Sequence, residues 1–229
     1  MAGRELFLVC GGSGGIGAAV CDALAKKGYS PVVGYRSGRA AAEAVAARTG
    51  GEAMELDLGS DASIDAVVAE LAKREEIVAG VILAASPMPV LATFSEIKAE
   101  DMELQWKVNV EGPQRLLAGM VKECFRKERR GVVVGLLTKA MGVESGAFPG
   151  RAAAKMGSYV IAKYGMAGVL AALAGDHSWV KVRSVSPGFV ETGMLKAFDE
   201  RFLGLARRKE KFRSAEEVGE EIVGEIEKS

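Results

Sequence analysis

The chain has 229 residues, of which 49% are hydrophobic and 26% charged, the balance of an ordinary globular protein that buries its own core. Its 30 basic and 30 acidic side chains cancel, so neither nucleic acid nor a membrane surface is an expected partner. Three widely spaced cysteines and a single histidine match neither a disulfide framework nor a metal site. We therefore expect free thiols, no bound metal and a cytoplasmic location. No apolar run is expected to reach the roughly 18–20 residues of a membrane helix, and a strand that begins by Glu5 leaves no room for a signal peptide.

Short apolar runs alternate with segments of helical period along most of the chain. We expect strands at residues 5–10, 31–35, 52–56, 78–85, 131–137 and 180–185. We expect helices at residues 16–27, 39–48, 62–74, 100–127 and 157–174. This alternation predicts an α/β fold: a Rossmann-type, doubly wound parallel sheet of about six strands with helices on both faces, in a single domain spanning residues 1–229. Ligands of such sheets bind beyond the carboxyl ends of the strands.

Two segments depart from this alternation. Residues 138–156 form a long connection rich in Ala and Gly, and loops of that length in compact domains are usually functional or mobile. Residues 199–229 are strongly charged and end in an apolar helical stripe over 215–226, which we interpret as a solvated surface helix.

The first expected strand runs directly into a glycine-rich turn that opens the first helix. Glycines there let the backbone turn tightly and let a pyrophosphate approach the N–H groups and partial positive charge of a helix N-terminus. A merely flexible loop is the alternative, but the strand–turn–helix context favours dinucleotide binding. The residues expected to contact the cofactor here are Gly11, Ser13, Gly15, Ile16 and Gly17.

The spacing of these glycines resembles the G-x-x-x-G-x-G turn of short-chain dehydrogenases/reductases, and the resemblance continues in order along most of the chain. Further segments that resemble the motifs of this family are Asp57-Leu58, Asn109-Val110-Glu111-Gly112, the pair Tyr159 and Lys163, and Pro187-Gly188 with Thr192. The resemblance implies a cofactor with its adenine near Asp57 and Leu58 and its nicotinamide near Pro187, Gly188 and Thr192. Within the family, the chain is similar to 3-oxoacyl-acyl-carrier-protein reductases.

The end of the second expected strand indicates which dinucleotide is bound. NAD-binding sheets of this kind usually place Asp or Glu there to hold the ribose 2′-OH, whereas a 2′-phosphate is bound by Arg. This chain has no carboxylate at that point, and Arg36, Ser37 and Arg39 follow. The arginines have an alternative interpretation as solvated loop residues, but their capacity for paired hydrogen bonds to phosphate makes NADP(H) the predicted cofactor.

Reduction of a ketone places negative charge on the carbonyl oxygen, so an acid must stand within hydrogen-bonding reach. Tyr159 is the candidate acid, and Lys163 lies one helical turn later on the same face, where its charge favours the phenolate. The resemblance adds that Lys163 holds the nicotinamide ribose and that Asn109 anchors a water that relays the proton. The structural alternative for Tyr159 and Lys163 is a surface i,i+4 pair.

Two departures from the family pattern bear on the catalytic site. The family's serine, which binds the substrate carbonyl about a dozen residues before the tyrosine, is replaced by Thr138, 21 residues before Tyr159. Ser145 is the alternative hydroxyl. Leu83-Ala84-Ala85-Ser86 stands where the family has N-N-A-G. Ala84 and Ala85 are therefore expected to contact the cofactor without the side-chain hydrogen bonds that usually steady the sheet.

The predicted function is the reduction of a small-molecule carbonyl substrate with NADPH. A carrier-bound 3-oxoacyl thioester, a sugar, a steroid and a pteridine are alternative substrates. A non-catalytic NADP(H)-binding sensor or scaffold is the alternative from another class, although a sensor needs no proton relay.

Two surface features bear on macromolecular partners. A basic cluster resembles the patch that carrier-protein reductases offer to an acidic carrier, with a solvated helix end as the alternative; it comprises Arg126, Lys127, Arg129 and Arg130. We also expect a homodimer, because apolar residues of 100–127 offer a partner face. The family's seventh strand, which tetramers use, is not found before Ser229.

Overall fold

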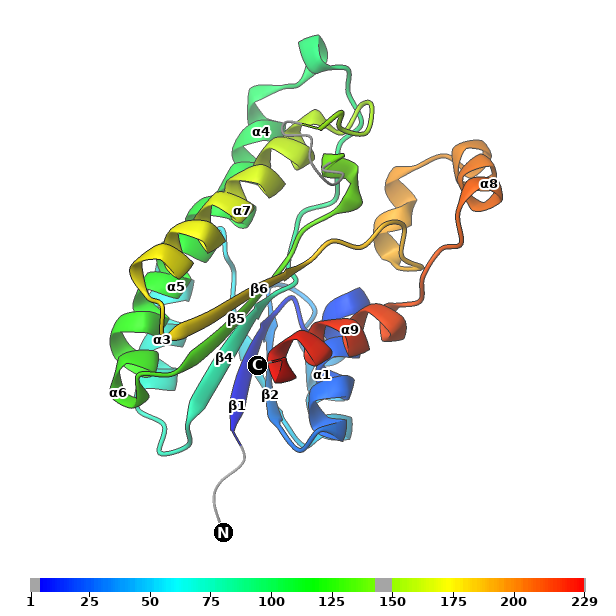
Figure 1. Ribbon diagram of the computed structural model, residues 1–229. Coiled ribbons are helices and arrows are strands. Elements are labelled where there is room, and N and C mark those ends of the chain that lie inside the picture. The colour runs from blue at the N-terminus through cyan, green and yellow to red at the C-terminus, as the bar shows by residue number, and fades with distance from the viewer. Residues whose placement is uncertain (1–4, 143–149, 229) are drawn as a thin grey trace.

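The computed structural model describes residues 5–142 and 150–228. Its centre is a sheet of six parallel strands in the order β3-β2-β1-β4-β5-β6, which confirms the predicted fold class and strand number (Figure 1). The strands are β1 (Leu6–Cys10), β2 (Ser30–Tyr35), β3 (Glu52–Glu55), β4 (Val78–Leu83), β5 (Gly131–Leu136) and β6 (Val180–Val185). The strand order changes direction between β1 and β4, and this switch point is where such sheets bind ligands.

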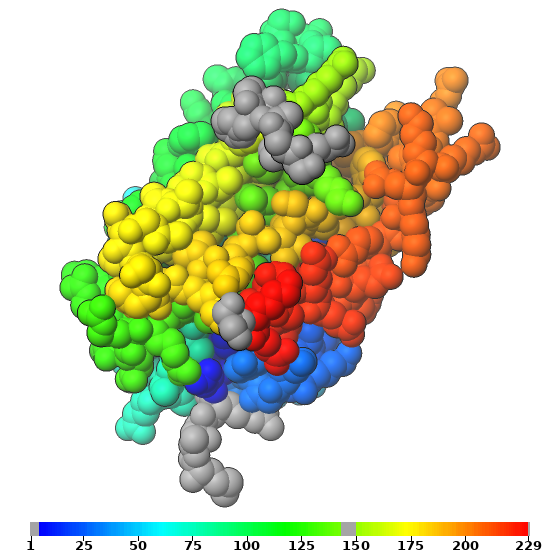
Figure 2. Space-filling view, viewed as in Figure 1, coloured from blue at the N-terminus to red at the C-terminus, as the bar shows by residue number. Residues whose placement is uncertain are grey.

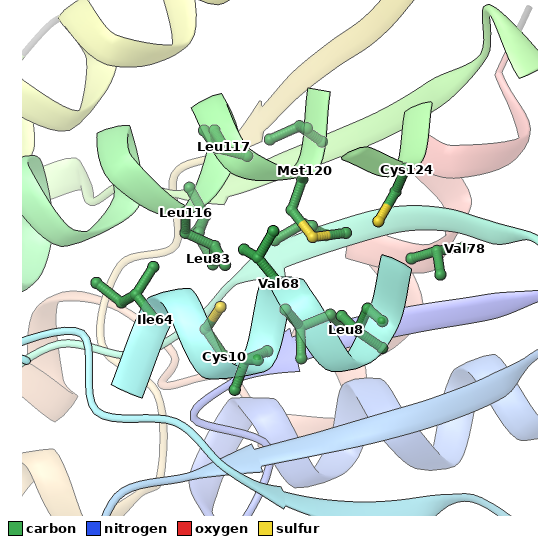
Figure 3. Packing of buried hydrophobic residues seen from close by; sticks show 14 of the residues in the cluster. Leu8, Cys10, Ile64, Val68, Val78, Leu83, Leu116, Leu117, Met120 and Cys124 are labelled. Atoms are coloured by element: carbon green, nitrogen blue, oxygen red, sulfur yellow. The ribbon is translucent and has the colours of Figure 1, made fainter. Parts of the chain in front are cut away.

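Helices cover both faces of the sheet because alternate residues of each strand point to opposite sides. Phe7 and Val9 of β1 pack with α1 (Gly15–Lys26), α2 (Arg39–Thr49) and α9 (Ala215–Glu227). Leu8 and Cys10 pack on the other side with α3 (Asp61–Ala72), α5 (Gly112–Met120) and α7 (Gly157–Asp176), and Figure 3 shows this cluster from close by. The two clusters make the doubly wound arrangement that the sequence predicts.

The C-terminal helix α9 is part of the core layer. Its apolar stripe, which includes Val218 and Ile222, is buried, and Gly219 lets the helix approach α1 so closely that a Cβ there would lie 2.8 Å from the Ala19 carbonyl carbon. Figure 2 shows α9 between β6 and α1. The interpretation of this segment as a solvated surface helix is therefore wrong for one of its faces.

The helix expected over residues 100–127 is interrupted by two wider π-helical turns. It consists of α4 (Ala99–Trp106), η2 (Lys107–Glu111), α5, η3 (Val121–Phe125) and α6 (Arg126–Glu128). Pro113 has no N–H and cannot donate to the carbonyl of Asn109, four residues earlier, which is a physical reason for the irregular turn at η2.

Helix α7 corrects one expectation drawn from hydropathy. Within the described part of the chain, it is the one helix whose length and composition would suffice to cross a membrane. In the structure it packs against the sheet, with Ala162, Met166 and Leu170 buried.

Residues 189–213 form an excursion whose secondary structure was not predicted from the sequence. It contains the turn η5 (Gly193–Ala197) and helix α8 (Glu200–Lys209), which stands away from the sheet in Figure 1. Its two ends are joined, because Glu191 N donates to Arg213 O (2.9 Å) and Arg213 N donates to Phe189 O (3.0 Å). We call residues 189–213 the lobe.

Candidate active site

A cavity of about 740 Å³ lies beyond the carboxyl ends of β1, β4 and β5. This volume is in the range of small-molecule and cofactor sites. β4 ends two residues earlier than predicted, and Ala84 and Ala85 line the cavity instead of extending the strand. Of the site residues predicted from sequence, all that the structure describes line this cavity except Asn109 and Arg39.

The glycine-rich turn has the backbone geometry that a phosphate cradle requires. Gly11 has a φ of +77°, and a Cβ on it would lie 2.9 Å from the Cα of Ala85. A Cβ on Gly17 would lie 2.1 Å from the carbonyl oxygen of Gly11, so only glycine fits there. No side chain caps the N-terminus of α1 at Gly14. The first N–H groups of the helix are thus free to bind an anion at the cavity wall.

The end of β2 brings one of the two predicted arginines to the cavity. Arg36 and Ser37 line it, as do Asp57 and Leu58 after β3. Arg39, the second predicted arginine, does not line the cavity in this structure, so its contact with the cofactor stays a prediction. Its Nε donates to the Tyr35 hydroxyl (3.0 Å), and the guanidinium lies 3.9 Å from Glu43, so the side chain is held along α2.

Tyr159 and Lys163 lie on the first two turns of α7 and face the cavity. Both are buried, which rules out the surface-pair alternative. The Lys163 ammonium nitrogen donates to the carbonyl of Leu136 at the end of β5 (2.8 Å) and lies 5.6 Å from the centre of the Tyr159 ring. Helix α7 therefore delivers a phenol and an amine to the same wall.

Burial dominates the ionisation of this pair. It lowers the pKa of Lys163 to about 7 and raises the pKa of Tyr159 to about 12, the latter opposed in part by a hydrogen bond with the Thr138 side chain. The expectation that the charge of Lys163 favours the phenolate is therefore not met in this structure. At neutral pH Tyr159 holds its proton, the form that an acid needs.

Thr138 lies beside Tyr159 despite the 21 residues between them. Its side chain hydrogen-bonds with Tyr159, and its Oγ1 also accepts from the N–H of Ala140 (3.1 Å). The hydroxyl is fixed at the N-cap of the short helix η4 (Lys139–Met141). Ser145, the alternative hydroxyl, lies outside the described residues.

Asn109 is fully buried in η2 and does not line the cavity, although its neighbour Val108 does. Its Nδ2 donates to both the backbone and the side-chain oxygen of Gln105 (3.0 Å each). Its Oδ1 is buried and has no hydrogen-bond partner among the described residues. An unpaired buried oxygen costs free energy unless a water or ligand hydrogen reaches it.

Comparison with known proteins now decides the family. The family model described as short chain dehydrogenase matches residues 5–202. The chain belongs to this family. It is 29% identical over 209 residues to the acetoacetyl-CoA reductase of Paracoccus denitrificans, covering 87% of this chain and 79% of that one. It is also 29% identical over 204 residues to the human 3-oxoacyl-[acyl-carrier-protein] reductase, covering 87% and 81%. The recognition made from the motifs is confirmed.

The solved structures agree on the fold. A 3-ketoacyl-(acyl-carrier-protein) reductase from Brucella melitensis, complexed with NADH, superposes with a TM-score of 0.84 at 19% identity, covering 96% of this chain and 89% of that one. At this identity the likeness establishes the architecture, and the assignment of roles depends on the residues above.

The lobe of this short-chain dehydrogenase closes one side of the cavity with apolar side chains. Phe189 and Phe198 line the cavity, and their rings pack edge to face with centroids 5.6 Å apart. Phe198 also packs against the small buried cluster that contains Met156 and Tyr159. The region after Thr192 is expected from the sequence to shape the substrate pocket, but the individual phenylalanines are not singled out because they are far apart in the chain; their recurrence between residues 189 and 212 is the signal that could have revealed them.

The basic cluster at α6 lies at the other end of the sheet. It directly precedes the start of β5, whereas the cavity lies past the strand's end. Arg130 forms an ion pair with Glu5, and Lys127 donates to the carbonyl of Ala72 (3.1 Å). A carrier docked on this cluster would therefore be remote from the cavity of the same subunit.

Proposed function

We propose that this short-chain dehydrogenase is an NADPH-dependent carbonyl reductase in which Tyr159 donates a proton to the carbonyl oxygen of a ketone. The observation that carries the proposal is the position of the buried, protonated phenol of Tyr159 on one cavity wall with Thr138 and Lys163. A protonated phenol beside a fixed hydroxyl and an amine is suited to protonating an oxygen that gains charge.

The cradle at the other end of the cavity fits a nicotinamide dinucleotide. The turn at Gly11 and Gly17 and the uncapped N-terminus of α1 would hold the pyrophosphate. Arg36 and Ser37 would bind the 2′-phosphate. When bound, the cofactor supplies the hydride. On the same basis Asp57 and Leu58 would contact the adenine, and Ala84, Ala85, Pro187, Gly188 and Thr192 would lie along the rest of the cofactor.

The protein's own groups handle the proton. Thr138 would hydrogen-bond the substrate carbonyl and hold it beside the Tyr159 hydroxyl. Lys163, whose pKa of about 7 lies near physiological pH, can pass a proton toward Tyr159 after transfer and would also bind the nicotinamide ribose. Phe198 and Met156 line the cavity beside Tyr159 and would limit the access of water to the reacting carbonyl.

Relatives named acetoacetyl-CoA reductase and 3-oxoacyl-[acyl-carrier-protein] reductase support a 3-oxoacyl thioester as substrate, either small or carrier-bound. NADPH consumption with ketones, aldehydes and 3-oxoacyl thioesters tests the reaction. Oxidation of NADPH that depends on one of these carbonyls is the expected result. Binding of NADPH with no turnover of any of them would leave the sensor or scaffold as the function.

The preference for NADPH is tested with two matched arginines. Arg36→Ala should weaken NADPH binding by about tenfold or more while leaving NADH binding unchanged, because only the 2′-phosphate loses its partner. Arg39→Ala is the control, since Arg39 does not line the cavity. Equal dissociation constants for NADPH and NADH in the wild-type protein would refute the cofactor assignment.

We also propose that the protein is a homodimer. Three large apolar side chains are more than a third exposed along α4 and α7, namely Leu104, Trp106 and Ile161. Such a patch is suited to a self-complementary contact. Light scattering at micromolar concentration should give twice the chain mass, and Trp106→Glu should lower it to one. A wild-type monomer or a stable tetramer would contradict the proposal.

A further inference from the structure

Gln105 is a fully buried polar side chain that the proposed mechanism does not use. It lies on α4 with 1% of its surface exposed. Its Nε2 donates to the carbonyls of Met88 (3.1 Å) and Pro87 (3.4 Å), and both of these residues line the cavity. Its Oε1 accepts from Nδ2 of Asn109 (3.0 Å). One side chain thus joins the loop after β4 to the residue expected to relay the proton.

The partners of Gln105 determine the orientation of both amides. Two backbone carbonyls can only accept, so the nitrogen of the Gln105 amide must face them. The oxygen of the same amide then faces Asn109, which must turn its own nitrogen toward it. Nδ2 is held a second time by the Gln105 carbonyl (3.0 Å). The group left over is Oδ1 of Asn109, an acceptor, and it is the buried oxygen without a partner among the described residues.

We propose that Gln105 is a positioning residue that ties the turn η2, which carries Asn109, to the loop after β4 and so fixes both beside the cavity, an inference that rests on the proposed reductase function. Without Gln105 the Asn109 amide and the carbonyls of Pro87 and Met88 would lose the side chain that joins them. The turn η2 that carries Asn109 packs against α7, where Gly165 leaves room for Val110; a Cβ there would lie 2.6 Å from Val110 Cγ2. The relay residue is thereby held on the helix that carries Tyr159.

The same side chain offsets a departure from the family pattern. The segment Leu83-Ala84-Ala85-Ser86 lacks the amide side chains that N-N-A-G would place after β4. Gln105 supplies amide hydrogen bonds to the next two residues from the helix side. The loop after β4 is therefore secured to α4 and η2.

We call the hydrogen-bonded unit of Gln105, Asn109 and the Pro87–Met88 backbone the hub. A thermal double-mutant cycle on the protein without cofactor tests whether Gln105 and Asn109 are energetically coupled in it. Gln105→Met keeps the length of the side chain but removes its hydrogen bonds, and it should lower the unfolding midpoint by roughly 4–8 °C. Asn109→Ala alone should also lower it, and the double variant should fall short of the sum. Gln114→Met, at an exposed glutamine on α5, is the matched control and should leave the midpoint unchanged. If the midpoint shifts of the two single variants add up to that of the double variant, Gln105 and Asn109 are not coupled and the hub is refuted.

Kinetics test whether the hub serves the reaction. Gln105→Met should lower kcat by about tenfold with KM for NADPH within twofold of wild type, and should have no further effect in the Asn109→Ala background. Gln105→Glu places a carboxylate against two carbonyls, so its kcat should recover as pH falls and the carboxyl becomes a donor. Equal losses in both backgrounds, or a pH profile unchanged from wild type, would overturn the positioning role. If the double-mutant cycle shows coupling but the wild-type protein reduces no carbonyl, the hub stands as a structural unit. The proposed function, and with it the role of Gln105 in the reaction, would then be refuted.

Discussion

The buried amine of Lys163 makes stability depend on pH in a direction that can be calculated. Burial lowers its pKa from an ordinary 10.5 to about 7 in the folded protein. Between these values the unfolded chain binds a proton that the folded protein does not, so stability rises with pH across this window. Each pH unit contributes up to about 1.4 kcal/mol. From pH 7 to pH 9 the gain is about 2 kcal/mol, because the folded amine is still half protonated at pH 7.

We therefore expect the wild-type free energy of unfolding to rise by about 2 kcal/mol relative to Lys163→Met between pH 7 and pH 9. The methionine has a similar length and no proton to lose. Urea unfolding of both proteins without cofactor measures the difference, and Lys209→Met, at an exposed lysine of α8, is the control. The raised pKa of Tyr159 does not interfere, because its effect is confined to pH values near 10 and above. Parallel pH dependence in wild type and Lys163→Met would refute the assignment of a neutral buried amine.

Three other substitutions test the site. Tyr159→Phe should lower kcat at least 100-fold with NADPH affinity nearly unchanged, since it removes the proton and keeps the ring; substantial residual rate would mean that another group is the acid. Thr138→Ala should lower kcat and raise the pKa of Tyr159 further, because a hydrogen bond that lowers it is lost; an unchanged rate would redirect attention to Ser145. Gly17→Ala should destabilise the fold by several kcal/mol and abolish cofactor binding, because its Cβ would collide with the Gly11 carbonyl; a well-folded variant that binds NADPH would contradict the cradle.

The parallel sheet was predictable because its central strands are buried on both faces. β1 and β4 have no exposed residue, so they stand out as continuous apolar runs in the sequence. The glycine turn was predictable for a similar reason, since its requirements are local. The turn η2 had a local signal as well, the proline at position 113 inside an expected helix, but periodicity alone obscured it.

What could not be predicted depends on contacts between distant segments. Arg36 and Arg39 look equivalent in sequence, and only the contacts of Arg39 with Tyr35 and Glu43 separate them. The ionisation of Lys163 depends on how deeply α7 packs, which outweighs the pairing with Tyr159 expected from their spacing. The partnership of Gln105 with the Pro87–Met88 backbone likewise has no sequence signature, because backbone carbonyls are present at every residue.

The joined ends of the lobe have a consequence for how this protein can change. Because Phe189, Glu191 and Arg213 exchange backbone hydrogen bonds, the chain leaves and re-enters the domain at a single point. The residues after Thr192 can be lengthened, shortened or replaced without altering the distance that the ends must span. Selection on substrate size can therefore act on this segment as an interchangeable part, while the strands and the glycine turn keep one geometry for the cofactor.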